Sequence, residues 1–219
     1  MATQLPAGTL ASVCVVHTIK PDAGRVGRTA IDKRPVDGPV RAEELGLVGD
    51  VQCDTRHHGG PEKALYAYAR EEADRWAAEL GRDIPPGFFG ENLATTGVTT
   101  SDATIGELWQ IGETQLRVTK ARTPCATFGR RMAEPRWVRR FAERGDCGAY
   151  LAVETPGSIQ AGDAVTVTHR PSHGLRVRDL FAVKMGTVID PELIQAALNA
   201  PEQLPASVAE TLRKALERN

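Results

Sequence analysis

Cationic and metal-binding side-chain types are concentrated in one short segment around residue 57. Arg56, His57 and His58 are followed directly by Gly59 and Gly60. Two glycines allow backbone N–H groups to turn toward one ligand, and an imidazole can bind a metal or transfer a proton near neutral pH. Arginine adds a fixed fork of donors that suits an oxyanion. The segment indicates a site for a phosphate, another oxyanion or a metal-oxo group, with a polar turn between strands as the alternative.

Cys125 has the most reactive setting of the four cysteines. It follows Arg122, Thr123 and Pro124 in the chain. This order predicts Thr123 as the N-cap of a helical turn, Pro124 at its first position and Cys125 at its second. A thiol near a helix N-terminus with cationic neighbours is expected to have a lowered pKa, which would make it a nucleophile or a metal ligand. The alternative is a small, buried apolar residue.

The other three cysteines lack this setting. Cys14 lies among valines and is interpreted as a core residue, and Cys53 and Cys147 have no cationic, helix-capping neighbours. No two cysteines are separated by two residues, so the paired spacing of a structural zinc site is missing. Each thiol is therefore interpreted singly.

A third candidate lies between Gly87 and Leu93. Glu91 and Asn92 could present an acceptor and a two-sided amide to a heterocycle, although a capped loop would use the same residue types. The sequence has no GxGxxG before a helix, no GxxxxGK[ST], no HExxH and no GxSxG. Nucleotide-binding folds with these fingerprints and the α/β-hydrolase elbow are therefore not supported.

Short strands are the elements expected to position these residues. The 21 glycines and 14 prolines favour many turns over long helices. The segment 20–49 is rich in Gly, Pro and charged residues, with an irregular stretch expected at residues 39–40 and a short turn at residues 43–45. Strands are expected at residues 10–19, 64–68, 149–153 and 164–169, with a hairpin of residues 107–111 and 114–119. The prediction is a mainly β, α+β fold: a closed or nearly closed β-barrel with two or three inserted helices.

Helical periodicity marks the rest of the chain. Helices are predicted at residues 70–80, where Gly81 is a natural stop, and at 136–143, 177–185, 191–199 and 205–218. The division is a barrel domain over residues 1–169 and a three-helix domain over 175–219. Residues 175–219 carry six Lys or Arg and six Asp or Glu. This balance favours a packing or protein-interaction role for the helices over binding to DNA.

The composition limits the classes of function. The 219-residue chain has 41% apolar and 25% charged residues and a net charge of −1, as is typical of a soluble globular protein. Without a basic excess, nucleic acid is a disfavoured partner. The longest apolar run, residues 10–16, is too short to span a bilayer, and no secretory signal is visible. We expect a cytoplasmic protein without a membrane or nucleic-acid partner.

Four motifs in order resemble one known family. They are residues 46–50 (GLVGD), residues 56–61 (RHHGGP) with Lys63, residues 89–93 (FGENL) and residues 122–125 (RTPC). Together they resemble the MOSC family, named for the C-terminal domain of molybdenum cofactor sulfurase. The terminal helices resemble the three-helix extension of its bacterial YiiM-like branch. The resemblance covers about residues 25–215.

The resemblance implies a MOSC-type β-barrel that binds the molybdenum cofactor, a pterin dithiolene with a phosphate tail. Cys125 matches the family's functional thiol, which ligates molybdenum or carries sulfur. YiiM-like proteins are associated with reducing N-hydroxylated compounds, such as hydroxylaminopurines, to amines, which is a detoxification reaction. This chain is therefore expected to be a molybdenum-dependent oxidoreductase with a small-molecule substrate and an electron-donor protein or reductant as partners. The oligomeric state is open, with a homodimer as one option.

The resemblance also suggests roles for individual residues. Cys125 would bind molybdenum, and Arg56, His57 and His58 would hold the cofactor's oxygen atoms, one imidazole delivering a proton. Candidates for the phosphate tail are Lys33, Lys63 and Arg122. Glu44, Glu91 and Asn92 would position the substrate or the pterin edge.

Three other functions remain open. A non-catalytic carrier of sulfur or of the molybdenum cofactor would use a persulfide on the same Cys125. A thiol-dependent hydrolase would combine Cys125 with His57 or His58 and need no metal. A transcriptional role for the terminal helices is the most distant alternative.

Overall fold

One long strand, β1 (Ala7–Pro21), connects the main parts of the sheet. The structure is a computed structural model, and it describes residues 7–55, 58–187, 189–200 and 204–217. It pairs through residues 7–9 with β11 (Ala164–His169), through 9–13 with β6 (Leu93–Thr96) and through 14–21 with β2 (Arg28–Pro35). Its β-branched residues favour extended backbone. The strand predicted at residues 10–19 is confirmed.

Seven strands close into a barrel. Their order is β11-β7-β8-β9-β5-β6-β1, and the pairing of β1 with β11 completes the ring. The strands β5 and β6 run parallel, and the other neighbours are antiparallel. The remaining bounds are β5 (Leu65–Ala69), β7 (Leu108–Ile111), β8 (Thr114–Ala121) and β9 (Ala149–Thr155). The predicted barrel of an α+β protein is therefore confirmed.

The segment between β1 and residue 49 is more regular than the sequence indicates. It contains β2 and two strands of a small second sheet, β3 (Val40–Glu43) and β4 (Gly46–Leu47), which β10 (Gly157–Ile159) completes. Val40, expected to be irregular, begins β3, whereas the turn expected at residues 43–45 agrees with the turn between β3 and β4. The strand β2 was not expected because Asp32 and Lys33 are buried in it, although charged residues usually mark an exposed strand face.

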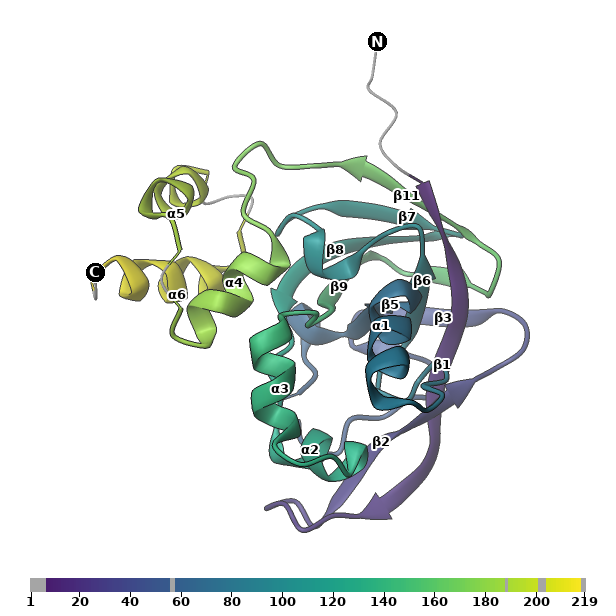
Figure 1. The fold of residues 1–219 in the computed structure, drawn as a ribbon. Coiled ribbons are helices and arrows are strands. Elements are labelled where there is room, and N and C mark those ends of the chain that lie inside the picture. Colours follow the sequence, from purple (N-terminus) through teal and green to yellow (C-terminus); the bar gives the residue numbers. More distant parts are fainter. Residues whose placement is uncertain (1–6, 56–57, 188, 201–203, 218–219) are drawn as a thin grey trace.

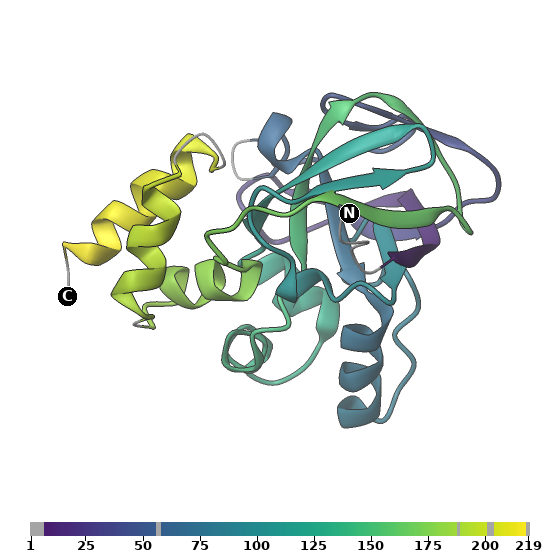
Figure 2. The ribbon, with the colours of Figure 1, turned by 90° about the horizontal axis from the view of Figure 1, so that it is seen from above.

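Helices surround the barrel on two sides (Figure 1). The helix α1 (Arg70–Leu80) has the predicted bounds and ends at Gly81, which adopts the left-handed conformation with φ of 62°. Helices α2 (Ala126–Met132) and α3 (Trp137–Arg144) follow β8, and α2 begins two residues later than the helical turn that the sequence predicts. Three further helices, α4 (Val177–Lys184), α5 (Pro191–Leu198) and α6 (Ala206–Leu216), form a separate group beside the barrel (Figure 2).

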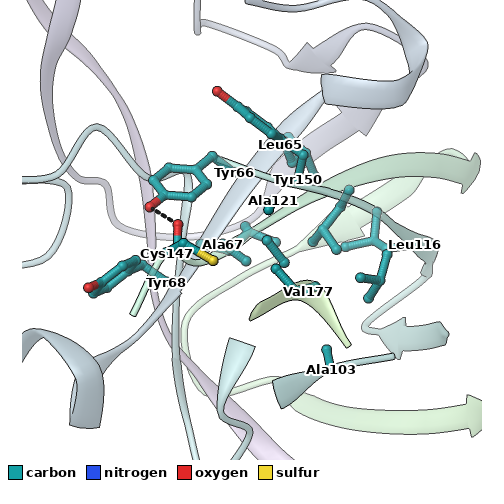
Figure 3. Close-up of a cluster of buried hydrophobic side chains, with 14 of the residues drawn as sticks. Leu65, Tyr66, Ala67, Tyr68, Ala103, Leu116, Ala121, Cys147, Tyr150 and Val177 are labelled. Carbon is teal, nitrogen blue, oxygen red and sulfur yellow. Dashed lines mark hydrogen bonds between the residues drawn. The ribbon is translucent and has the colours of Figure 1, made fainter. Parts of the chain in front are cut away.

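Two tyrosines of β5 tie the barrel interior to the segment before β9. The Tyr66 hydroxyl donates a hydrogen bond of 2.9 Å to the Cys147 carbonyl, and the Tyr68 hydroxyl donates one of 2.8 Å to the Asp146 carbonyl. Figure 3 shows Tyr66 and Cys147 beside apolar side chains from β8 and from Val177 of α4. The core of the barrel therefore continues into the first of the terminal helices.

An aromatic cluster joins the helices to the barrel. It consists of Trp76, Phe89, Phe128, Trp137, Phe141 and Phe181, all buried. Phe141 is in its middle: the ring centroid lies 5.0 Å from that of Phe128 and 6.3 Å from that of Phe181. Because these rings come from α1, α2, α3, α4 and the loop before β6, their packing positions α2 next to the barrel.

Within the described ranges, no helix is both long enough and apolar enough to cross a bilayer. The division of the chain at residues 169 and 175 into two domains stays a prediction.

Replacing Phe141 with Ala tests the aromatic cluster. We expect the free energy of unfolding to fall by about 3–5 kcal/mol, because the substitution leaves a cavity among buried rings. The measurement is urea denaturation followed by tryptophan fluorescence. Val138→Ala, on the exposed side of the same helix, is the matched control and should cost less than about 1 kcal/mol. Equal losses in the two variants would contradict this assignment.

Candidate active site

A pocket of about 550 Å³ contains the candidate thiol. Its walls come from the β1–β2 hairpin, from residues 51–54, from His58 and Lys63, and from the segment 122–130 that enters α2. Four of the predicted site residues line it together: Cys125, His58, Lys63 and Arg122. Arg56 and His57 lie outside the described residues. The volume is in the range of pockets that bind a cofactor or a small substrate.

Cys125 itself is the N-cap residue of α2. Its backbone is extended, with φ of −127°, and its carbonyl accepts the first helical hydrogen bond from the Gly129 N–H at 2.9 Å. The predicted N-cap at Thr123 is therefore wrong, because the segment from 122 to 125 stays non-helical and the helix begins at Ala126. The thiol is half-buried and lines the pocket.

Arg122 places a buried positive charge at the pocket. The residue is 5% exposed, and its guanidinium carbon lies 4.3 Å from the Phe128 ring centroid and 4.8 Å from that of Tyr66. Its Nη1 atom has no hydrogen-bond partner among the described residues. Burial alone would lower the pKa of Arg122, but neighbouring Tyr66, Tyr150 and Cys125 raise it above its usual value. A buried cation with an unused donor requires an acceptor, and an anionic ligand would provide one.

His58 is held by the barrel wall. Its Nδ1 atom lies 3.1 Å from the hydroxyl oxygen of Tyr150, a residue of β9. Gly59 and Gly60 follow with φ of 83° and 78°, values that only glycine adopts readily. The loop can therefore turn sharply after the imidazole, as the paired glycines predict.

A buried cluster around Asp50 contains two other predicted site residues. The Asp50 carboxylate pairs with the Lys33 ammonium and accepts hydrogen bonds from the Asn92 amide at 2.8 Å and from the Val16 N–H at 2.9 Å. Burial lowers the pKa of Lys33, and the Asp50 charge opposes that change. Neither Lys33 nor Asn92 lines the pocket. Their contacts join β1, β2 and the loop before β6.

Glu91 and Glu44 also lie away from the Cys125 pocket. The Glu91 carboxylate is 2% exposed and accepts hydrogen bonds from the Gly87 and Phe89 N–H groups at 2.6 and 3.0 Å. Burial raises its pKa. These contacts are those of a capped loop, the alternative that the sequence left open. Glu44 lines a second pocket, of about 370 Å³, formed by residues 43–48 with Asp50 and Gln52.

Two features of the pocket were missed by sequence reasoning. Cys53 is a second thiol in its lining, and its position four residues before His57 was the available signal. An ion pair of Asp22 with Arg130 joins the β1–β2 hairpin to α2, with bonds of 2.8 and 2.6 Å. No local pattern could reveal that pair, because the residues are 108 positions apart.

No group of three or more His, Cys, Asp or Glu side chains could hold a metal ion anywhere in the described part of the chain. A single thiolate with cationic neighbours instead fits a metal that arrives with its own ligands. The unused Arg122 donor is consistent with an anionic group on that ligand.

The class of protein follows from the fold, the site and a family model. The MOSC domain model matches residues 54–166, just over half of the chain, and the chain belongs to this family. MOSC domains are associated with binding of the molybdenum cofactor. The function of this chain is therefore related to the molybdenum cofactor.

Known relatives place the chain in the YiiM-like branch. It is 32% identical over 190 residues to the protein YiiM of Escherichia coli, covering 84% of each chain. The crystal structure of YiiM from Geobacillus stearothermophilus superposes with a TM-score of 0.76 at 25% identity, covering 95% of this chain and 99% of that one. A protein of Gibberella moniliformis named reductase is 31% identical over 189 residues, which are 76% of this chain and a third of that protein.

The Asp22–Arg130 ion pair gives the pocket wall a defined pH dependence. The Arg130 hydrogen bonds lower the pKa of Asp22 to about 2, with smaller contributions from Gly24 and Thr127. Since the folded pKa lies below the unfolded value, the stabilisation is present above about pH 4 and is lost as the pH falls through 2. We expect Asp22→Asn to be less stable than the wild type at pH 5–7. The difference should vanish between pH 4 and 2 in urea denaturation, and a difference independent of pH would contradict this.

Proposed function

We propose that this protein binds the molybdenum cofactor in the Cys125 pocket and reduces N-hydroxylated compounds, such as hydroxylaminopurines, to amines. The observation that carries the proposal is the placement in one pocket of the Cys125 thiol and the Arg122 Nη1 donor, which has no partner among the described residues. The family supports the choice of cofactor, and the relative named reductase supports the class of reaction.

The residues present fit this cofactor. A thiolate is a soft ligand and suits molybdenum, with Cys125 as the protein's contribution to the metal. Arg122 and Lys63 supply positive charge for the cofactor's oxygen atoms and phosphate. Arg56 and His57 belong to the same proposal through their motif. Lys33 and Asn92 act as positioning residues, because their contacts reach the pocket through Asp50 and the chain that follows it.

The chemistry divides between the cofactor and the protein. When bound, the cofactor supplies the two-electron redox step. The overall reduction takes up two electrons and two protons and releases the hydroxyl oxygen as water. The protein orients the substrate in the pocket and provides a proton for the oxygen that leaves nitrogen. His58 is the candidate donor, since imidazole is the commonest general acid in enzymes and the Nδ1 atom of His58 lies 3.1 Å from the Tyr150 hydroxyl.

Cys125→Ala tests the ligand role. In a host that makes the cofactor, we expect near-stoichiometric molybdenum in the purified wild type and almost none in the variant, because the protein's bond to the metal is lost. Elemental analysis measures this, with thermal denaturation to verify folding. Cys53→Ser is the matched control in the same pocket and should keep its metal. Unchanged molybdenum in Cys125→Ala would refute the assignment.

Turnover of an N-hydroxylated purine with a chemical reductant tests the activity. We expect amine formation by the wild type, and a fall in kcat per bound molybdenum of about 10²–10⁴ in His58→Gln, because the proton donor is removed. Chromatography of substrate and amine provides the measurement. Wild-type protein that shows no turnover and carries a persulfide on Cys125 would instead identify a sulfur carrier.

A further inference from the structure

Positive charge is concentrated on the β1–β2 hairpin and the neighbouring helix α2. The cationic side chains that reach solvent there are Lys20, Arg25, Arg28, Arg34, Arg130 and Arg131. Figure 1 shows the hairpin extending beside α2, away from the terminal helices α5 and α6. The chain as a whole carries a net charge of −1, so this group of cations, termed the basic face, is a local feature.

One carboxylate is shared by several cations of the basic face. Oδ2 of Asp32 lies 2.8 Å from Lys20 Nζ and 3.9 Å from Arg34 Nη2. Oδ1 of the same side chain lies 3.0 Å from Arg131 Nη2. The other carboxylate of this face, Asp22, is engaged in its own ion pair. The described residues therefore leave positive charge in excess on the basic face.

Two arginines of the face lie at the entrance of the Cys125 pocket. Arg25 and Arg28 are exposed and line the pocket, and neither side chain has an ion-pair or hydrogen-bond partner among the described residues. Val26 and Val51 line the same pocket and are 38% and 40% exposed. Arginines beside exposed apolar side chains are typical of a surface that a protein partner covers.

The basic face extends beyond the pocket. Arg28 and Arg34 lie on the same side of β2, and at about 3.3 Å per residue the strand carries them roughly 20 Å apart. Lys20, Arg34 and Arg131 do not line the pocket, so a small ligand bound there would leave them uncovered. A protein interface of ordinary size, about 800 Å² on each partner, covers such a length. The exposed valines have no counterpart on a phosphate backbone, which favours an acidic protein over a nucleic acid.

We propose that the basic face is the docking surface of an acidic electron-transfer protein. The partner's role rests on the proposed function, because each reduction of an N-hydroxyl group to an amine takes up two electrons and two protons and releases water. The partner is oxidised by two electrons in each turnover, and the protons come from solvent. Docking at the pocket entrance places the partner's redox group next to the site that uses these electrons. Electrostatic attraction speeds such encounters and weakens with salt.

Two acidic electron-transfer proteins, flavodoxin and ferredoxin, are the probes of the first test. Calorimetric titration of the full-length protein at low ionic strength should show binding of at least one probe. Added salt should weaken that binding, and Arg25→Glu and Arg28→Glu should each weaken it about tenfold.

Arg213→Glu in α6 is the matched control, because it reverses the same charge at an exposed position outside the basic face. The control should bind the probe like the wild type, and thermal denaturation verifies that each variant folds. Three results would overturn the proposal: no binding of either probe, binding that both hairpin variants leave unchanged, or tighter binding of duplex DNA than of the probes.

The second test connects docking with turnover and uses a double variant outside the pocket, Lys20→Gln with Arg34→Gln. Arg131 still pairs with Asp32 in this variant. We expect the KM for the reduced probe protein to rise about tenfold, because charge is removed from the docking surface. Turnover with reduced methyl viologen, a small donor that needs no docking surface, should be unchanged.

The two donors separate failure of this inference from failure of the proposed function. An unchanged KM for the probe protein, with viologen supporting turnover, would refute the docking surface and leave the proposed function intact. Absence of turnover with viologen would contradict the proposed function, and the binding titration would still decide whether the basic face binds an acidic protein.

Discussion

The buried carboxylate of Asp50 is the contact on which the site depends most. Its side chain is 1% exposed and accepts from a backbone N–H of β1, from the Lys33 ammonium of β2 and from the Asn92 amide. Removing one partner of a buried ion pair leaves an uncompensated charge and typically costs about 3–5 kcal/mol. Asp50 immediately precedes the segment 51–54 that lines the pocket, so the pair fixes where that wall begins.

The pocket is formed by segments that are distant in sequence, and a different contact holds each of them. Asp50 secures the wall that contains Cys53, and Asp22 secures the hairpin against α2. The aromatic rings around Phe141 hold α2 in place, because Phe128 of α2 packs among them. This arrangement separates stability from chemistry: the barrel and the aromatic cluster bury the apolar surface, while the loops at one edge carry the reactive groups.

The elements that the sequence predicted are those whose local pattern agrees with their environment. The helix α1 has an apolar stripe and a glycine stop, and the β7–β8 hairpin alternates in and out. The strand β2 was missed because Lys33 and Asp32 are buried, and their burial depends on partners elsewhere in the chain. In the site, residue type and motif identified Cys125 and His58 correctly as pocket residues. The same signals could not distinguish Glu91, whose carboxylate bonds to the N–H groups of its own loop, from a residue that faces a ligand.

The positive charges of the site differ in how they respond to pH. Arg122 remains charged at every pH at which the protein folds, and its position between two aromatic rings fixes the direction of its donors. Lys63 has a lowered pKa and a flexible stem, and its charge depends on what lies beside it. A ligand anion near Arg122 therefore meets a permanent, oriented charge. An anion near Lys63 would raise the pKa of that lysine and so strengthen its own binding.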